Sequence, residues 1–283
     1  MEHPLRRKVK AESIMKSIAL TDRQERERQY YEAYSQYSPV DHVPFEPVLG
    51  KEKRSENSYW YAAELAVRYF KSSDQRLLDF GCGQGYYAMQ YAKIGYLVHG
   101  FDISPSNVDC AKQLARTYNY ETRTNFSVGA AESLDYPDEF FDMIIGMDIL
   151  HHVEIEQAIA ECVRVLKPGG VGIFHEPVRV PVFDAVRETR LGTWLVPKAA
   201  SLERHITEDE RKLFKSELEA VKSSFLNSEE ARFLLFSRLE KFFRSRQRAM
   251  EKFDQLVFRR LPFMKRYGGR VVLTLHKGER ADR

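Results

Sequence analysis

Short apolar segments alternate with amphipathic ones between residues 55 and 177, and this alternation constrains the fold more than any other feature. The apolar runs RLLDF, YLVHGFD and FFDMIIGM predict strands, whereas EIEQAIAECVRVL has its apolar residues on one helical face. Strands that are apolar on both faces need cover on both, which favours a parallel sheet between two layers of helices. We therefore expect an α/β fold with a mostly parallel, seven-stranded sheet and helices on both faces.

The flanking regions differ from this α/β part in composition and in predicted secondary structure. Residues 1–54 are polar, with a helix predicted through RQERERQYYEAYSQY after Thr21, and we interpret them as an N-terminal helical extension or lid. Residues 55–283 then form the main domain, in which 178–266 predict a mostly helical cap inserted before the last strand, RVVLTLHK. Within this insertion, EAVKSSFL predicts a further strand, followed by amphipathic helices at about 228–243 and 245–261.

Composition argues against several classes of protein. No segment has the ~18 consecutive apolar residues that a membrane helix needs. The basic N-terminus lacks the apolar run of a secretory signal. The three cysteines, Cys82, Cys110 and Cys162, have neither close pairing nor metal-ligand spacing. We therefore expect free thiols, no metal site and a cytoplasmic location.

The charge of the chain is small overall but uneven. The net charge of +3 is too low to predict a nucleic-acid partner by itself. From Arg259 onward, however, the chain has eight basic residues and two acidic ones. A solvated basic end is the interpretation that we favour, and peripheral contact with a membrane or another anionic partner is the alternative. The oligomeric state is not readable from the sequence.

A glycine-rich loop follows the first predicted strand. In LLDFGCGQG the strand ends at Asp79, and a helix begins directly after Gly85. Glycines let a ligand approach the backbone closely, and the N-terminus of the helix presents free N–H groups. Asp102 ends the second strand, where a carboxylate can accept hydrogen bonds from a ribose. Because ligands in such sheets bind outside the carboxyl ends of the strands, these two tips predict a ligand site.

The spacing of this loop points to a known family. Gly-x-Gly-x-Gly, with an acid two residues before it, differs from the dinucleotide fingerprint Gly-x-Gly-x-x-Gly. The segments DFGCGQG, GFDIS, LHHV and ExxRVLKPGG, in this order, resemble the class I S-adenosylmethionine-dependent methyltransferases, and within them the small-molecule, type 11 group. The resemblance covers about residues 75–177. It implies a Rossmann-like fold, S-adenosylmethionine as cofactor and methyl transfer as activity.

The resemblance also implies which residues bind the cofactor. Asp79 would lie near the methionine amino group, Asp102 would hold the ribose hydroxyls, and Ile103 would pack on adenine. Where the family usually has an aspartate beside the adenine amine, this chain has Ala130, so either Glu132 or backbone replaces that contact or the contact is missing. The full set of predicted cofactor-binding residues is Asp79, Gly81, Cys82, Gly83, Gly85, Asp102, Ile103, Ala130, Ala131, Glu132 and Met147.

Three residues are candidates for the chemistry. Methyl transfer from a sulfonium is a direct displacement, so the protein mainly aligns the acceptor and, for oxygen or nitrogen, removes a proton. His152 follows the fourth strand and is a natural base, although similar enzymes often have a histidine there for structural or cofactor-side reasons. Glu176, at the end of the fifth strand, either faces the acceptor or makes a local cap or salt bridge. His205 is the third candidate.

The acceptor site is expected outside these motifs. Several aromatic residues form either a lid over it or ordinary core, and these are Tyr30, Tyr31, Tyr34, Tyr59, Trp60, Tyr61, Phe233, Phe236 and Phe243. We expect a small-molecule acceptor, apolar or aromatic, methylated on oxygen, carbon or nitrogen. The alternatives are an RNA or protein methyltransferase, suggested by the basic end, and a non-catalytic S-adenosylmethionine-binding module. GMDI after the fourth strand is unlike the Asn-Pro-Pro-Tyr type sequence of amino-group enzymes of nucleic acids.

Overall fold

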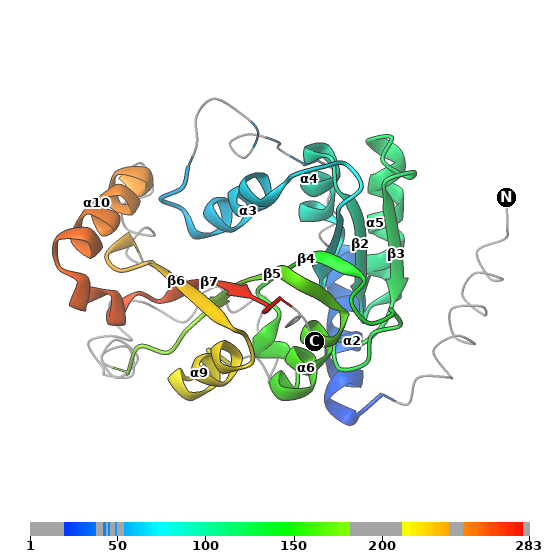
Figure 1. Cartoon of the computed structure of the whole chain (residues 1–283). Coiled ribbons are helices and arrows are strands. Elements are labelled where there is room, and N and C mark those ends of the chain that lie inside the picture. The colour runs from blue at the N-terminus through cyan, green and yellow to red at the C-terminus, as the bar shows by residue number, and fades with distance from the viewer. Residues whose placement is uncertain are drawn as a thin grey trace, which may run out of the picture.

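A seven-stranded sheet forms the centre of the computed structural model, which describes residues 20–37, 42–43, 45, 49, 54–181, 211–237 and 246–279. The strand order is β3-β2-β1-β4-β5-β7-β6 (Figure 1). The strands are β1 Arg76–Phe80, β2 Leu97–Asp102, β3 Thr124–Val128, β4 Phe141–Met147, β5 Leu166–Pro177, β6 Asn227–Phe233 and β7 Arg270–His276. β1 to β5 pair in parallel, whereas β7 is antiparallel to both β5 and β6. This confirms the expected mostly parallel, Rossmann-like sheet.

Helices cover both faces of the sheet, as the alternation of segments predicts. They are α2 Asp22–Tyr37, α3 Ser58–Tyr69, α4 Tyr86–Ile94, α5 Pro105–Thr117, α6 Ile155–Val165, α9 Lys215–Ser223 and α10 Gln247–Arg260, with short 3-10 helices η1 Leu150–His152 and η6 Pro262–Tyr267. Successive residues of β1 point to opposite faces. Leu77 therefore packs in the core with α3, α4 and α5, and Leu78 packs in the core with α6 and α9 (Figure 1).

Local sequence explains where several helices begin and end. The side chain of Asn57 caps α3 by accepting from the backbone N–H groups of Tyr59 and Trp60. Ser104 caps α5 in the same way, with a proline at the first helical position, as expected. Gly95 ends α4, and its N–H donates to the carbonyl of Tyr91.

Two predictions in the insertion before the last strand are wrong. The predicted strand over 219–226 lies largely in helix α9, whose buried residues Leu218 and Val221 face α6 at helical spacing. The predicted helix over about 228–243 begins instead with strand β6, and its part beyond residue 237 lies outside the described residues. β6 is a partly exposed edge strand, and its pairing with β7 overrides the helical preference of its sequence.

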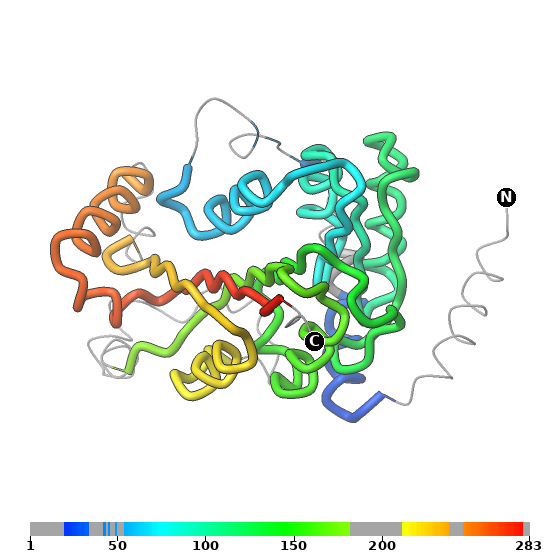
Figure 2. The backbone as a smooth tube through the Cα atoms, viewed as in Figure 1, coloured from blue at the N-terminus to red at the C-terminus, as the bar shows by residue number. Residues whose placement is uncertain are grey.

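The last two predicted elements are confirmed. Helix α10 occupies most of the predicted range 245–261, and β7 is the expected final strand. Figure 2 shows that the backbone of α10 and η6 leads directly into β7. Because β6 belongs to the sheet, the insertion is not purely helical, and its interpretation as a cap stays a prediction. Among the described residues, no helix is both long and apolar enough to cross a membrane.

Candidate functional site

A cavity of about 260 Å³ lies at the edge of the sheet where the parallel strands end. The strand order reverses between β1 and β4, and in such sheets this switch point is where ligands bind. Helix α2 contributes to its wall. The lining includes these predicted site residues: Gly81, Gly83, Asp102, Ile103, Ala130, Ala131, Glu132, Met147 and His152. Asp79, Cys82, Gly85 and Glu176 are not part of this lining.

The glycine loop has positive φ values at Gly83 and Gly85, a backbone conformation that favours glycine. Gly83 has a φ of +50°, and a Cβ there would meet no atom within 4 Å, so a side chain would extend into open space at the cavity wall. Gly85 has a φ of +84°, and a Cβ there would lie 2.8 Å from the Cβ of Ala111 on α5. The buried Cys82 donates its backbone N–H to the carbonyl of Phe101 at 2.8 Å, which fixes the loop to β2.

Asp102 is fixed at the tip of β2 by three donors. Its Oδ2 accepts from the backbone N–H of Gly83 at 3.0 Å, and its Oδ1 accepts from the backbone N–H of Ser104 at 2.9 Å and from Nδ2 of Asn107 at 3.0 Å. Burial raises the pKa of Asp102, while these hydrogen bonds favour its ionised form. The carboxylate therefore stands in one orientation at the cavity wall before any ligand binds.

Asp79 is a buried acid with incomplete hydrogen bonding. Its side chain is only 2% exposed, and its Oδ2 has no hydrogen-bond partner in the part of the chain that the structure describes. Burial and the nearby charge of Asp102 raise the pKa of Asp79 to about 8, although a hydrogen bond from the backbone of Ala88 opposes this rise. A cationic group at this position would offset the burial of both acids, so the pair fits a positively charged ligand.

Glu132 joins the cavity to helix α2. Its Oε2 accepts from Nε2 of Gln24 at 2.8 Å, and its Oε1 accepts from the backbone N–H of Glu154 at 2.9 Å. The neighbouring Ala130 and Ala131 line the same wall without a polar side chain. Glu132 is therefore the one side-chain carboxylate that the segment 129–132 brings to the cavity.

Helix α2 is attached to the site through polar contacts along its length. Glu32 accepts from Oγ of Ser104 at 2.9 Å and from the backbone N–H of Ser106 at 3.2 Å, at the start of α5. Arg23 pairs with Glu154 at 2.6 Å. Gln24, Glu27 and Tyr31 line the cavity, and of these the sequence singled out only Tyr31. No motif marks the two missed residues, because their role comes from contacts between distant segments.

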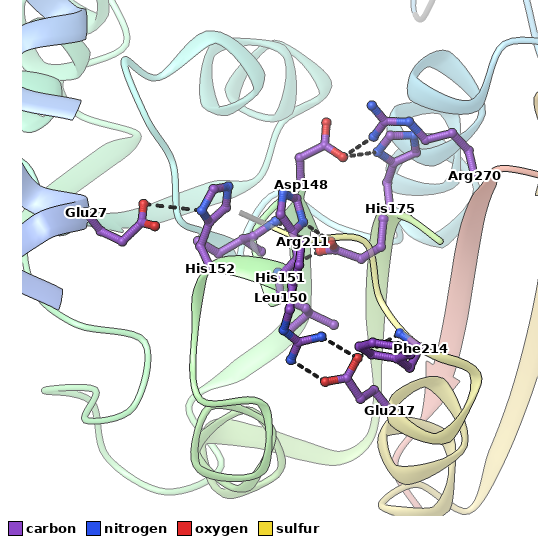
Figure 3. Close-up of polar contacts among 12 residues, drawn as sticks. Glu27, Asp148, Leu150, His151, His152, His175, Arg211, Phe214, Glu217 and Arg270 are labelled. Carbon is purple, nitrogen blue, oxygen red and sulfur yellow. Dashed lines mark hydrogen bonds and ion pairs between the residues drawn. The ribbon is translucent and has the colours of Figure 1, made fainter. Parts of the chain in front are cut away.

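His152 lies between the cavity and α2 (Figure 3). Its Nε2 is 3.2 Å from the hydroxyl of Tyr31, and its Nδ1 is 3.2 Å from Oε2 of Glu27. The imidazole is only 7% exposed. Because Nε2 is at hydrogen-bond distance from Tyr31 and Nδ1 is at ion-pair distance from Glu27, the contacts of His152 favour a role in holding this helix. Its role as a base stays a prediction.

The other two catalytic candidates do not line the cavity. Glu176 is fully buried, and its Oε1 accepts from the backbone N–H groups of Ile149 and Leu150. Its Oε2 lies 2.7 Å from Nδ1 of His151. These contacts fix the short helix η1 after β4. They agree with the local cap or salt bridge that was the alternative to a role of Glu176 at the acceptor. His205 lies outside the described residues.

A second polar cluster borders the cavity at Asp148, which follows β4 with a φ of +56° (Figure 3). Its carboxylate accepts from the hydroxyl of Tyr59 at 2.6 Å and from the guanidinium of Arg270, and it lies 3.3 Å from Nδ1 of His175. Although burial opposes ionisation, His175 and Arg270 hold the pKa of Asp148 well below its usual range. Sequence patterns did not mark Arg270, because it reaches the site from the first position of β7.

Some of the aromatic residues considered for a lid border the cavity, whereas others belong to the core or the surface. Tyr31 lines the cavity, and Tyr59 contacts Asp148 beside it. Phe233 is only 4% exposed and lies 5.3 Å from Tyr61 between ring centroids, so it belongs to the core. Phe236 is partly exposed on the surface. Phe243 and the side chain of Tyr34 lie outside the described parts.

Known proteins match this chain in sequence and in fold. Residues 78–174 match the family model described as "Methyltransferase domain". Norajmaline N-methyltransferase from Rauvolfia serpentina is 36% identical over 97 residues, which are 34% of this chain and 33% of that protein. Ubiquinone biosynthesis O-methyltransferase from Mesorhizobium japonicum is 35% identical over 97 residues, 34% of this chain and 38% of that protein. The matched region spans a third to about half of the length of such curated relatives.

Among solved structures, geranyl diphosphate C-methyltransferase from Streptomyces coelicolor, in complex with S-adenosyl-L-homocysteine, aligns over 92% of this chain and all of its own. The TM-score is 0.60 and the sequence identity is 15%, so this likeness concerns the fold. The family model, the relatives and the glycine loop agree. Residues 78–174 therefore match the class I S-adenosylmethionine-dependent methyltransferases, which use S-adenosylmethionine as cofactor.

Proposed function

We propose that this protein transfers a methyl group from S-adenosylmethionine to a small organic acceptor. The observation that carries the proposal is the cavity at the switch point of the sheet, whose wall combines the glycine loop, the fixed carboxylate of Asp102 and the polar face of α2. The unsatisfied oxygen of the buried Asp79 supports a ligand with positive charge, and S-adenosylmethionine has both an ammonium and a sulfonium group.

The residues of the cavity suggest how each part of the cofactor is held. Asp102 accepts from the ribose hydroxyls, and Gly83 leaves room for the ligand. Asp79, behind the cavity wall, offers its unsatisfied oxygen to the ammonium. Ile103 and Ala131 supply apolar contact to the adenine. Glu132 takes over the contact to the adenine amine that an aspartate would make at position 130. The cofactor supplies the electrophilic methyl group and the thioether leaving group.

The acceptor is proposed to enter beside Met147 and Asp148, which border the methyl-donor end of the cavity. The protein acts mainly by alignment, since the displacement needs the acceptor atom, the methyl carbon and the leaving sulfur in line. For an oxygen or nitrogen acceptor, His152 is the candidate base, because its imidazole lines the cavity. Glu176 is proposed as a positioning residue for η1. The relatives methylate nitrogen or oxygen by name, so the acceptor atom here stays open.

We also propose that residues 1–54 act as a lid and that residues 55–283 form the domain it closes. The contacts of α2 with Glu132, Ser104 and His152 support this division. If α2 closes over bound cofactor, S-adenosyl-L-homocysteine should protect the segment around residues 38–54 from limited proteolysis. Equal cleavage rates with and without the ligand would contradict the lid.

A labelled methyl donor tests the activity directly. The purified protein is incubated with methyl-labelled S-adenosylmethionine and fractionated small-molecule extracts, and label is followed into extractable products. We expect label in a low-molecular-mass, organic-soluble product, lost in Asp102→Ala and kept in the control Asp109→Ala on the exposed face of α5. Label appearing only in RNA or protein, removed by nuclease or protease, would contradict a small-molecule acceptor.

A further inference from the structure

Helix α10 and the 3-10 helix η6 form a continuous surface, residues 247–267, which we call the α10–η6 surface. Its only two acidic residues point inward. Glu251 is 5% exposed and accepts from Nδ2 of Asn57 at 2.8 Å. Asp254 is 1% exposed and accepts from Oγ of Ser237 at 2.6 Å and from three backbone N–H groups at residues 235–237. The outer side of this surface therefore has no carboxylate of its own.

Large apolar side chains point outward from the same surface. Phe253 is 52% exposed, Leu256 50%, Leu261 46% and Phe263 59%. Phe253 and Leu256 are three residues apart and share one face of α10. The partly exposed Phe236 extends this patch, with its ring centroid 5.6 Å from that of Phe253. Such a cluster of exposed apolar side chains is unusual on the surface of a monomeric domain and indicates a contact surface.

Basic side chains surround these apolar residues. Five of them are exposed between residues 252 and 266, namely Lys252, Arg259, Arg260, Lys265 and Arg266. Within the described part of the chain, Lys252 pairs with Glu56 at 3.8 Å, and an exposed pair at this distance contributes little. The α10–η6 surface is thus apolar and cationic at once, whereas the whole chain has a net charge of only +3.

This combination favours an anionic lipid bilayer over other occupants. A helix with apolar side chains flanked by Lys and Arg lies in the membrane interface, where burial of the apolar groups and attraction to anionic headgroups add. A second copy of this surface would bring cations against cations. The phosphates of a nucleic acid would pair with the basic side chains but would leave Phe253 and Phe263 exposed to water.

The α10–η6 surface also lies on the same edge of the sheet as the cavity. η6 ends at Tyr267, and Arg270, three residues later, begins β7 and contacts Asp148 in the cavity wall. β7 is antiparallel to β5, so its first residues stand beside the carboxyl end of β5, next to Pro177. A membrane bound to this surface would therefore face the edge where the acceptor is proposed to enter.

We propose that the α10–η6 surface docks this protein on anionic lipid bilayers. Docking does not depend on the proposed methyl transfer. If that transfer holds as well, the acceptor is an apolar or amphiphilic molecule that the protein takes up at the membrane.

Vesicle flotation of the full-length protein tests the proposal. Vesicles of phosphatidylcholine alone are compared with vesicles containing phosphatidylglycerol, at low and at high salt. We expect flotation only with the anionic lipid, and weaker flotation at high salt because salt screens the basic side chains. Phe253→Ser/Phe263→Ser and Lys265→Glu/Arg266→Glu should each lower the bound fraction at least about tenfold, since each removes apolar contact or headgroup attraction.

Matched controls separate docking from loss of fold. Leu226→Ser removes an apolar side chain that is 70% exposed at the far end of β6, and Arg116→Glu reverses a charge on α5. Both should float like the unchanged protein, and all variants should keep the thermal shift caused by S-adenosyl-L-homocysteine. Equal binding to neutral vesicles, no flotation at all, or unaltered flotation of the two double variants would overturn the proposal. A tight complex with RNA, or a dimer that Phe253→Ser/Phe263→Ser dissociates, without flotation, would overturn it as well.

Discussion

Replacing Asp79 by asparagine should stabilise the protein without ligand and weaken its binding of S-adenosylmethionine. In the folded protein, burial and Asp102 raise the pKa of Asp79 to about 8. The unfolded chain has an ordinary aspartate with a pKa of about 3.9. Between these two pH values the unfolded state ionises more readily than the folded state. The stability of the ligand-free protein should therefore fall as pH rises from about 4 to about 8, and then level off.

The size of this effect follows from the pKa difference. At pH 7 a rise of the pKa from about 3.9 to about 8 corresponds to ~4 kcal/mol of lost folding stability, at 1.36 kcal/mol per pH unit. An asparagine side chain cannot ionise, so Asp79→Asn should recover up to that amount and raise the melting temperature by roughly 5–10 °C at pH 7. At pH 4 the two proteins should melt at nearly the same temperature.

The same substitution should weaken cofactor binding. A hydrogen bond between a buried carboxylate and an ammonium group contributes about 1.5–3 kcal/mol, so Kd for S-adenosylmethionine should rise roughly 10- to 150-fold. Thermal melting from pH 4 to pH 9 and calorimetric titration measure the two effects. Asp135→Asn, which changes an exposed acid after β3, is the matched control and should alter neither. A variant that is no more stable at pH 7 than the unchanged protein, or that binds the cofactor equally well, would refute this reasoning.

Three further substitutions test other parts of the site. Gly83→Ala should raise Kd for S-adenosyl-L-homocysteine at least about tenfold, measured by calorimetry, because its Cβ enters the cavity and its φ of +50° suits glycine; unchanged affinity would contradict the proposed path of the ligand. Glu27→Gln should weaken the attachment of α2 and speed cleavage around residues 38–54 in limited proteolysis, and no change would argue against the Glu27–His152 contact as an anchor. Arg270→Met should cost about 1–3 kcal/mol at neutral pH by leaving the half-buried Asp148 without its cation, as judged by urea unfolding. That loss of stability should shrink at acidic pH. Because the folded-state pKa of Asp148 is lowered, the stability that its ionised form contributes is lost as pH falls. A loss that does not depend on pH would contradict the role of this ion pair.

The features that sequence predicts well here are local ones. The loop from Asp79 to Gly85 needs its glycines within a few residues, because their positive φ values are set by the short turn that leads from β1 into α4. Asp102 is predictable for a similar reason, since the last residue of a strand next to β1 must lie near that loop. The parallel sheet follows from repeated apolar strands, whose burial on both faces leaves few other arrangements.

The features that were missed depend on contacts between distant segments. Gln24 and Glu27 lie in a polar helix whose sequence contains no binding motif, and they reach the cavity only because α2 packs on α5. Arg270 belongs to the last strand and contacts Asp148 across the sheet edge. β6 has a helix-favouring sequence and forms a strand because β7 has a free edge to pair with. Local pattern does not encode these pairings.

Calorimetric titration of the purified protein with S-adenosylmethionine at pH 7, in two buffers of different ionisation enthalpy, tests the central claim most directly. The claim is that the tips of β1 and β2 bind this cation through two buried acids. It predicts one bound molecule per chain and the release of close to one proton, because Asp79, with a pKa of about 8, must ionise to receive the ammonium group. Absence of binding by S-adenosylmethionine, or binding with no proton released, would contradict it.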